Sequence, residues 1–181
     1  ASAALQNVRR LGVEHVVMLT GDNRETAEAI AREVGIEEIR AELLPADKVA
    51  AIDELVERYG KVAMIGDGIN DAPAMARATI GLAMGAAGSD AAIEAADVAF
   101  MSDDLSKLPW LIEHSKRTVG VIRQNVIFAL AVKAVFVVLT LLGYGSLWMA
   151  IAADMGASLL VTFNALRLLG ESPTNLPRAV R

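Results

Sequence analysis

The stretch Met64-Ile65-Gly66-Asp67-Gly68-Ile69-Asn70-Asp71-Ala72-Pro73 decides the fold of this chain. The stretch begins inside an apolar run, residues 62–65, whose composition is typical of a buried strand. Its two glycines permit a tight turn and a close approach of the backbone to an anion. Asp67 and Asp71 supply the hard oxygen ligands that Mg²⁺ prefers, and Asn70 adds a hydrogen-bonding group without charge. The stretch therefore predicts a loop that binds magnesium and a phosphoryl group, the alternative being a solvated acidic turn.

Helix-like and strand-like segments alternate along the chain around this loop. We expect strands at residues 13–19, 62–65, 80–83 and 97–100, and helices at residues 3–11, 24–34 and 45–59. Asp22 or Asn23 caps the helix at 24–34, which Gly35 ends, while Pro45 opens the next helix. Strands separated by helices indicate a parallel sheet with a helical layer on both faces.

Two polar turns follow strands of this predicted sheet. Thr20-Gly21-Asp22 comes directly after the strand at 13–19, and Gly66-Asp67-Gly68 comes after the strand at 62–65. In open α/β sheets, ligands bind outside the carboxyl ends of the strands. We therefore expect both turns at one functional edge.

Composition and charge indicate a soluble unit attached to a membrane. The chain has 181 residues and no cysteine, which excludes disulfides and thiolate metal ligands within it. Hydrophobic residues make up 54% of it, and only 4% of residues are aromatic. Before Val121 there are 20 acidic against 12 basic residues, and from Val121 onward 2 against 5. Because residue 1 is not Met and lies directly at the start of a predicted helix, we expect that the sequence is truncated upstream.

Two apolar stretches, residues 126–142 and 147–169, flank the break Gly143-Tyr144-Gly145-Ser146. Each is close to the roughly 20 residues that span a bilayer, so we predict a transmembrane hairpin, the alternative being a pair of buried core helices. Basic residues flank the outer ends: Lys116, Arg117, Arg123, Arg167, Arg178 and Arg181. The positive-inside rule then places both ends in the cytoplasm and the loop outside.

Lys133 and Asp154 interrupt the two apolar stretches with opposite charges. Each lies roughly 13 Å from the glycine turn at 1.5 Å per residue, close to the middle of the bilayer. Charged residues at that depth are candidate functional residues, and two opposite charges at equal depth are able to pair. Geometry leaves a functional pair and a purely structural pair equally open.

The polar motifs resemble those of the haloacid-dehalogenase superfamily in the form found in P-type ATPases. The Asp67 loop resembles the fourth motif, Thr20-Gly21-Asp22-Asn23 the second, and Leu44-Pro45-Ala46-Asp47-Lys48 the third. Alone, Thr20 would be read as a helix cap and Lys48 as a solvated residue, but the order and spacing of the motifs favour the family. The resemblance covers residues 16–169.

The resemblance implies an α/β fold: a partial haloacid-dehalogenase-like (Rossmann-type) parallel sheet followed by a two-helix transmembrane hairpin. It assigns a phosphoryl site and a Mg²⁺ site, with ATP as the substrate. The phosphoryl site comprises Thr20, Gly21, Asp22, Lys48 and Asn70, and the Mg²⁺ site comprises Asp67 and Asp71. The family's nucleophilic Asp-Lys-Thr-Gly-Thr segment does not occur here. Since its strand lies at the centre of the family's sheet, we expect a gap there and an inactive fragment whose partner is the missing N-terminal portion.

The last apolar stretch resembles the final helix of the zinc/cadmium/lead-exporting subclass. Asp154-Met155-Gly156 and Asn164-Ala165-Leu166-Arg167-Leu168-Leu169 carry this resemblance. It implies that Asp154 binds the transported Zn²⁺, Cd²⁺ or Pb²⁺ and that Lys133 is its counter-ion. Copper exporters instead carry Met and Ser near that position. The implied protein is a multi-pass ATPase of a lipid bilayer, the bacterial plasma membrane, without a nucleic-acid partner.

We accordingly divide the chain into four parts: 1–103, the C-terminal part of the phosphorylation domain; 104–125, a linking amphipathic helix; 126–169, the last two transmembrane helices; and 170–181, a cytoplasmic tail. The predicted function is ATP-driven metal export through an aspartyl-phosphate. Two alternatives are a membrane-tethered phosphatase of the same superfamily and a non-catalytic membrane remnant.

Overall fold

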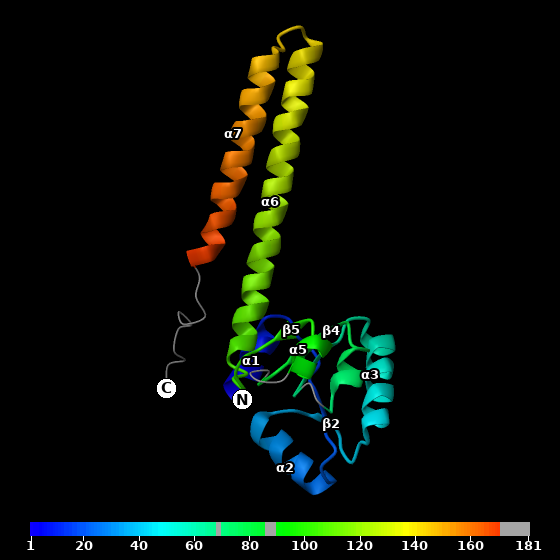
Figure 1. Cartoon of the computed structure of the whole chain (residues 1–181). Helices are drawn as coiled ribbons and strands as arrows, with labels where there is room; N and C mark the ends of the chain where they lie inside the picture. The colour runs from blue at the N-terminus through cyan, green and yellow to red at the C-terminus, as the bar shows by residue number, and fades with distance from the viewer. Residues whose placement is uncertain (68–69, 86–89, 171–181) are drawn as a thin grey trace. The chain divides into compact units, whose positions relative to one another are not determined.

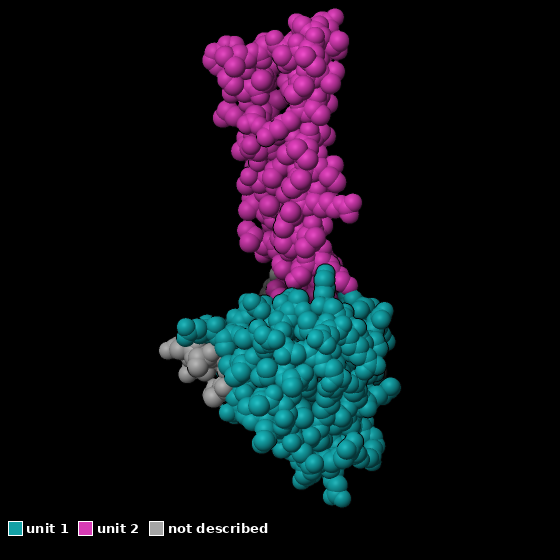
Figure 2. Space-filling model, turned by 90° about the vertical axis from the view of Figure 1, so that its right-hand side faces the viewer, with its two compact units in different colours: residues 1–108 teal, residues 109–181 magenta. Residues whose placement is uncertain are grey.

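A computed structural model describes residues 1–67, 70–85 and 90–170 of the chain. Gly68 and Ile69 of the magnesium loop lie outside the described residues, as does the segment 171–181 with Arg178 and Arg181. The chain forms two compact units, Ala1–Leu108 and Pro109–Arg181 (Figures 1 and 2). We describe each unit by itself.

The first unit alternates short parallel strands with helices (Figure 1). Its elements are α1 (Ser2–Arg10), β1 (Val17–Leu19), α2 (Arg24–Val34), β2 (Glu38–Arg40), α3 (Pro45–Tyr59), β3 (Ala63–Gly66), α4 (Ala72–Met75), β4 (Ile80–Ala83), α5 (Asp90–Ala95) and β5 (Val98–Ala99). The strands form two sheets, β1-β2 and β3-β4-β5, and every pairing is parallel. The expected interruption is present, because β1 and β3 belong to different sheets.

Two strands differ from the sequence-based expectation. The strand expected from residue 13 begins only at Val17, where pairing with Glu38 of β2 begins. Strand β2 was not predicted from the sequence, because its three residues include two charged ones and offer no apolar alternation. Its register with β1 accounts for it, since Met18 lies opposite Ile39. Backbone pairing outweighs side-chain pattern at this edge.

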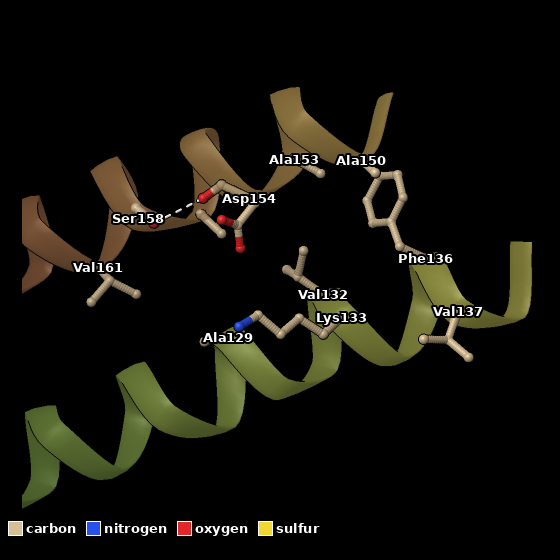
Figure 3. Close-up of a pocket in the computed structure, with 11 residues that line it drawn as sticks. Ala129, Val132, Lys133, Phe136, Val137, Ala150, Ala153, Asp154, Ser158 and Val161 are labelled. Atoms are coloured by element: carbon tan, nitrogen blue, oxygen red, sulfur yellow. Dashed lines mark hydrogen bonds between the residues drawn. The ribbon is translucent and has the colours of Figure 1, made fainter. Parts of the chain in front are cut away.

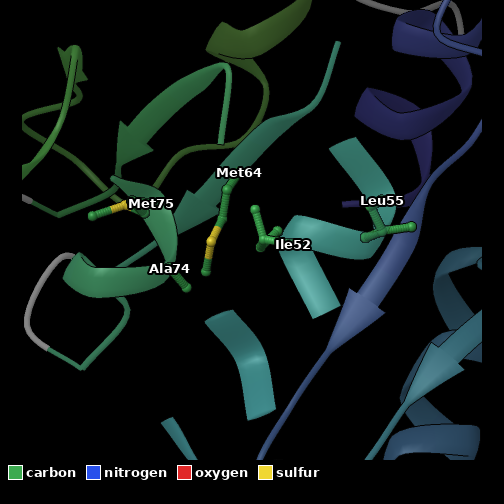
Figure 4. Close-up of a cluster of buried hydrophobic side chains, with 5 residues drawn as sticks. All are labelled: Ile52, Leu55, Met64, Ala74 and Met75. Carbon is green, nitrogen blue, oxygen red and sulfur yellow. The ribbon is translucent and has the colours of Figure 1, made fainter. Parts of the chain in front are cut away.

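Helix α3 packs against strands of both sheets. Its buried residues Ile52 and Leu55 form a cluster with Met64 of β3 and with Ala74 and Met75 of α4 (Figure 4). Partly buried residues of β1 pack against the same cluster, namely Val17 and Leu19. Helix α3 therefore packs against both β1 and β3 and joins the two sheets in one unit.

The helix boundaries follow their capping residues. The Asn23 side chain accepts a hydrogen bond from the Thr26 N–H at 2.9 Å, and α2 ends at Gly35, whose φ of 81° is left-handed. At α3, the Asp47 carboxylate accepts from the Leu44 N–H at 3.0 Å. This cap places Lys48 in the first turn of the helix.

The second unit is a helical hairpin in which α6 (Lys107–Leu141) and α7 (Leu147–Leu166) run antiparallel, and a 3₁₀ turn (Arg167–Gly170) follows (Figure 1). At about 1.5 Å per residue, α6 exceeds the ~30 Å core of a bilayer by several turns. Both helices are long and apolar enough to cross a membrane, and none of their apolar windows is buried within the structure. This exposure argues against a pair of buried core helices.

Replacing Ile52 with Ala tests the role of α3 in joining the two sheets. The side chain is 2% exposed, so the cavity should lower the free energy of unfolding of this unit by about 2–4 kcal/mol. Hydrogen exchange of the β3 amides, in the detergent-solubilised chain, measures the change. Ile30→Ala, at a residue 43% exposed, is the matched control and should cost clearly less. Equal protection losses in both variants would contradict this packing role.

Candidate functional site

The turn after β1 is organised by its own side chains. The Thr20 hydroxyl donates a hydrogen bond to the Asp22 carboxylate at 3.0 Å and accepts one from the Asp22 N–H at 3.1 Å. Gly21 lies against the following segment, since a Cβ there would come within 3.2 Å of the Leu43 carbonyl oxygen. These contacts hold the Thr20 hydroxyl at the end of the strand, next to the N-terminus of α2.

Backbone hydrogen bonds connect this turn to the segment that leads into α3. The Thr20 N–H donates to the Arg40 carbonyl at 3.0 Å, and the Leu43 N–H donates to the Thr20 carbonyl at 3.1 Å. The Arg40 guanidinium in turn donates to both carboxylate oxygens of Glu54 on α3, at 2.7 and 2.9 Å. These hydrogen bonds hold the pKa of Glu54 below its usual range. The Thr20 turn is thereby attached to the helix that carries Lys48.

Lys48 of α3 forms an ion pair with Asp71, which follows the turn at the end of β3. The Lys48 ammonium lies 2.6 Å from Asp71 Oδ1, and the two side chains are only 17% and 16% exposed. Asp67, at the end of β3, accepts a long hydrogen bond of 3.4 Å from the Asn70 N–H. The structure therefore places Lys48, which the resemblance assigns to the phosphoryl site, against Asp71, which it assigns to the Mg²⁺ site. Within the described residues, no hydrogen bond joins the Thr20 side chain to this pair.

Gly66 makes the approach of Asp71 possible. A Cβ added at Gly66 would lie 2.6 Å from Asp71 Oδ2 and 2.7 Å from its Cβ. Real Cβ contacts are not that short, so any side chain here would displace Asp71. The two carboxylates Asp67 and Asp71 supply hard oxygen donors from one loop, and such a donor set fits Mg²⁺.

The hairpin contains a cavity between its two helices. The cavity has a volume of about 440 Å³ and is lined mainly by small and apolar side chains. Its lining comprises Ala129, Val132, Lys133, Phe136, Val137, Ala150, Ala153, Asp154, Ala157, Ser158 and Val161. Figure 3 shows the Asp154 carboxylate and the Lys133 ammonium directed into this space. The two charged residues singled out in the sequence thus share one cavity.

The side chains of Lys133 and Asp154 do not form a salt bridge within the described part of the hairpin. The Asp154 backbone carbonyl accepts a hydrogen bond from the Ser158 hydroxyl at 2.9 Å (Figure 3). This bond runs within α7, so it leaves the Asp154 carboxylate available to the cavity.

Two further residues of the hairpin were given no role from the sequence. Asn125 of α6 and Asn164 of α7 are joined by a hydrogen bond of 2.8 Å between their side-chain amides. The available signal was two amides in otherwise apolar helices, since such groups need a polar partner away from water. Sequence spacing does not reveal that the two amides meet each other.

Comparison with known proteins gives consistent matches. The family model for haloacid dehalogenase-like hydrolases matches residues 1–79. A probable cadmium-transporting ATPase of Listeria monocytogenes is 54% identical over 165 residues, which cover 91% of this chain and 23% of that protein. The zinc/cadmium/lead-transporting P-type ATPase of Escherichia coli K12 is 52% identical over 93% of this chain and 22% of its own length.

A solved structure extends the match to three dimensions. The crystal structure of a zinc-transporting PIB-type ATPase in the E2.Pi state aligns with a TM-score of 0.85 and 50% identity. The alignment covers 93% of this chain and 27% of that one. The chain spans about a quarter of the length of the relatives it matches. The chain has a haloacid-dehalogenase-like parallel fold followed by two long apolar helices, and it matches the C-terminal region of cadmium- and zinc-transporting P-type ATPases.

Proposed function

We propose that the chain is the C-terminal part of a P-type ATPase that exports Zn²⁺, Cd²⁺ or Pb²⁺ across a membrane. The observation that carries the proposal is the cavity between two apolar helices, which holds one carboxylate and one ammonium group. Charged groups are costly in hydrocarbon, so a pair of them in a shared cavity favours an ion pathway over simple anchoring. The transport ATPases that match this chain supply the reaction class.

The first unit contributes a phosphoryl-binding cradle in this proposal. An aspartyl-phosphate would form on a residue outside this chain, and Lys48, Thr20 and Asn70 would surround the transferred phosphoryl oxygens. Gly21 and Asp22 would keep the Thr20 hydroxyl in place, as their contacts suggest. Phosphoryl transfer depends mainly on positioning and on neutralisation of charge, and Lys48 is a suitably placed cation.

Asp67 and Asp71 would hold Mg²⁺ beside this cradle. The ion, when bound, would neutralise part of the phosphoryl charge. Asp71 would orient the Lys48 ammonium through their ion pair, while the hydrogen bond from the Asn70 N–H would help to fix the Asp67 carboxylate.

The hairpin would carry the transported cation. The Asp154 carboxylate would bind the divalent ion, and the Lys133 ammonium would replace the ion after its release. The cavity supports this exchange because it holds both side chains without a salt bridge between them. The basic residues Arg123 and Arg167 lie toward the helix ends away from the Gly143 turn, which favours cytoplasmic ends.

Removing the Asp154 carboxylate tests the metal site. In the complete transporter, Asp154→Ala should lower zinc-stimulated ATP hydrolysis at least about 100-fold, since the cavity loses its only acidic group. Thr162→Ala is the matched control, because the Thr162 hydroxyl bonds to the Ser158 carbonyl within α7. The control should stay within about twofold of the unmodified protein. Full zinc stimulation in Asp154→Ala would rule out this assignment.

Removing the Lys133 ammonium tests its role as a counter-ion. Lys133→Ala should weaken coupling, so that zinc transport into inverted vesicles falls more than ATP hydrolysis does. The reason is that no internal cation would then displace the metal from Asp154. Measuring transport and hydrolysis on the same vesicles gives the ratio. An unchanged ratio of ions moved to ATP consumed would indicate a purely structural pair.

Adding a methyl group at Gly66 tests the magnesium loop. Gly66→Ala should displace Asp71 from Lys48 and raise the Mg²⁺ concentration for half-maximal ATP hydrolysis at least about fivefold. Gly120→Ala is the matched control, since a Cβ there meets no atom within 4 Å. An unchanged Mg²⁺ requirement in Gly66→Ala would show that Asp71 does not act at the metal site.

A further inference from the structure

A short chain of hydrogen bonds crosses from α7 to α6 and back. Arg167 Nη1 donates to Asn164 Oδ1 at 2.9 Å, and Asn164 Nδ2 donates to Asn125 Oδ1 at 2.8 Å. Asn125 Nδ2 then donates to the Val161 carbonyl oxygen at 3.4 Å. Each amide thus uses its oxygen as an acceptor and its nitrogen as a donor. We call Asn125, Asn164 and their two crossing hydrogen bonds the asparagine bridge.

The asparagine bridge attaches α6 to α7 at two points. Asn125 contacts the side chain of Asn164 and the carbonyl of Val161, three residues earlier on α7. A slide of either helix along its axis would break both hydrogen bonds. The hydroxyls of Thr140, Ser158 and Thr162 contribute nothing to this link, because each donates to a carbonyl of its own helix.

The asparagine bridge and the cavity lie along the same line of facing residues between α6 and α7. The two helices are antiparallel. Moving forward along α6 and backward along α7 by the same number of residues therefore leads to positions that face each other. Four residues from the Asn125–Val161 contact are Ala129 and Ala157, which both line the cavity. A further four residues reach Lys133 and Ala153, the neighbour of Asp154. At about 1.5 Å per residue, Lys133 lies roughly 12 Å along α6 from Asn125.

We propose that the asparagine bridge is a positioning element that sets the register of α6 and α7, so that Lys133 and Asp154 face the same cavity. In an apolar environment the amides have no water as an alternative partner, so they favour the register in which they meet. A single asparagine at a helix–helix contact fixes register in the same way in coiled coils. The functional consequence rests on the proposed metal site.

Cross-linking tests the register independently of transport. The chain contains no cysteine, so the pair Ala129→Cys and Ala157→Cys is the only thiol pair in the 181-residue chain in lipid vesicles. With the bridge intact, a thiol-reactive cross-linker that spans roughly 8–10 Å, the usual distance between packed helix axes, should join the two thiols. Adding Asn125→Leu, which removes both crossing bonds, should slow this reaction at least about fivefold.

Two controls make the cross-linking decisive. Thr162→Ala removes a hydrogen bond inside α7 and should leave the rate unchanged. The pair Ala129→Cys and Ala153→Cys, offset by one turn, should react slowly with the bridge intact and faster in Asn125→Leu. An unchanged rate for the level pair in Asn125→Leu would overturn the proposal, and so would a level pair that never reacts.

Transport kinetics test the functional consequence. In the complete transporter, Asn125→Leu and Asn164→Leu should each raise the zinc concentration for half-maximal ATP hydrolysis at least about tenfold, with the maximal rate within about twofold. The double variant should be no worse than Asn125→Leu alone, because that variant already removes both crossing hydrogen bonds. A lower maximal rate at an unchanged half-maximal concentration would indicate a folding defect and overturn the positioning role. If Asp154→Ala keeps zinc stimulation, the metal site fails while cross-linking still decides the register.

Discussion

The packing of α3 against both sheets is the contact on which the first unit depends. Among the residues that the structure describes, no backbone hydrogen bond joins the two sheets, so side-chain packing holds them together. Ile52 and Leu55 provide it by contacting Met64 of β3 while Val17 and Leu19 of β1 pack on the same cluster. The same helix presents Lys48 at its first turn and holds Glu54 against Arg40. Helix α3 therefore contacts both the segment of the Thr20 turn and the segment of the Asp71 turn, and it fixes the two turns relative to each other.

In the proposed membrane the hairpin would obey a different constraint, which is the absence of water around its apolar segments. Polar groups there must bond within their own helix, meet across the contact, or line the cavity, and each solution is present. Ser158 and Thr162 use their own helix, Asn125 meets Asn164, and Asp154 lines the cavity. Only the last leaves an ionisable group able to exchange partners. In the proposed transporter, this distribution would separate the residues that fix the helices from the residue that binds the transported ion.

The sequence predicted the elements whose boundaries have local causes. Helix α2 begins and ends where Asn23 and Gly35 indicated, and α3 covers Pro45–Tyr59 as expected. The beginning of β1 and the whole of β2 were wrong or missed, because backbone pairing between strands determines them. Helix α6 begins at Lys107, a few residues later than expected, after Asp104 accepts a hydrogen bond from the Ser106 N–H.

The candidate site also contains some features that the sequence predicted and others that it did not. The resemblance assigned Lys48 and Asp71 to neighbouring phosphoryl and Mg²⁺ sites, and the ion pair between them is a contact that the sequence did not predict. The equal depth of Lys133 and Asp154 followed from counting residues on each side of the Gly143 turn. Within the described hairpin, the structure shows no salt bridge between them, although both line the cavity. The link between Asn125 and Asn164 depends on helix rotation, which counting residues does not supply.

The fixed asparagines and the unpaired charges suggest how one cavity could serve two occupants. A divalent cation at Asp154 would repel the Lys133 ammonium, whereas an empty carboxylate would attract it. The metal-bound and the metal-free cavity must therefore have the same helix register. A change of register at each exchange would break the hydrogen bonds of Asn125. The long, flexible lysine side chain is suited to this task, because its ammonium moves by rotation about several bonds. In this arrangement, the rigid asparagine bridge would set the register of the two helices. The mobile Lys133 ammonium would exchange with the metal ion at Asp154.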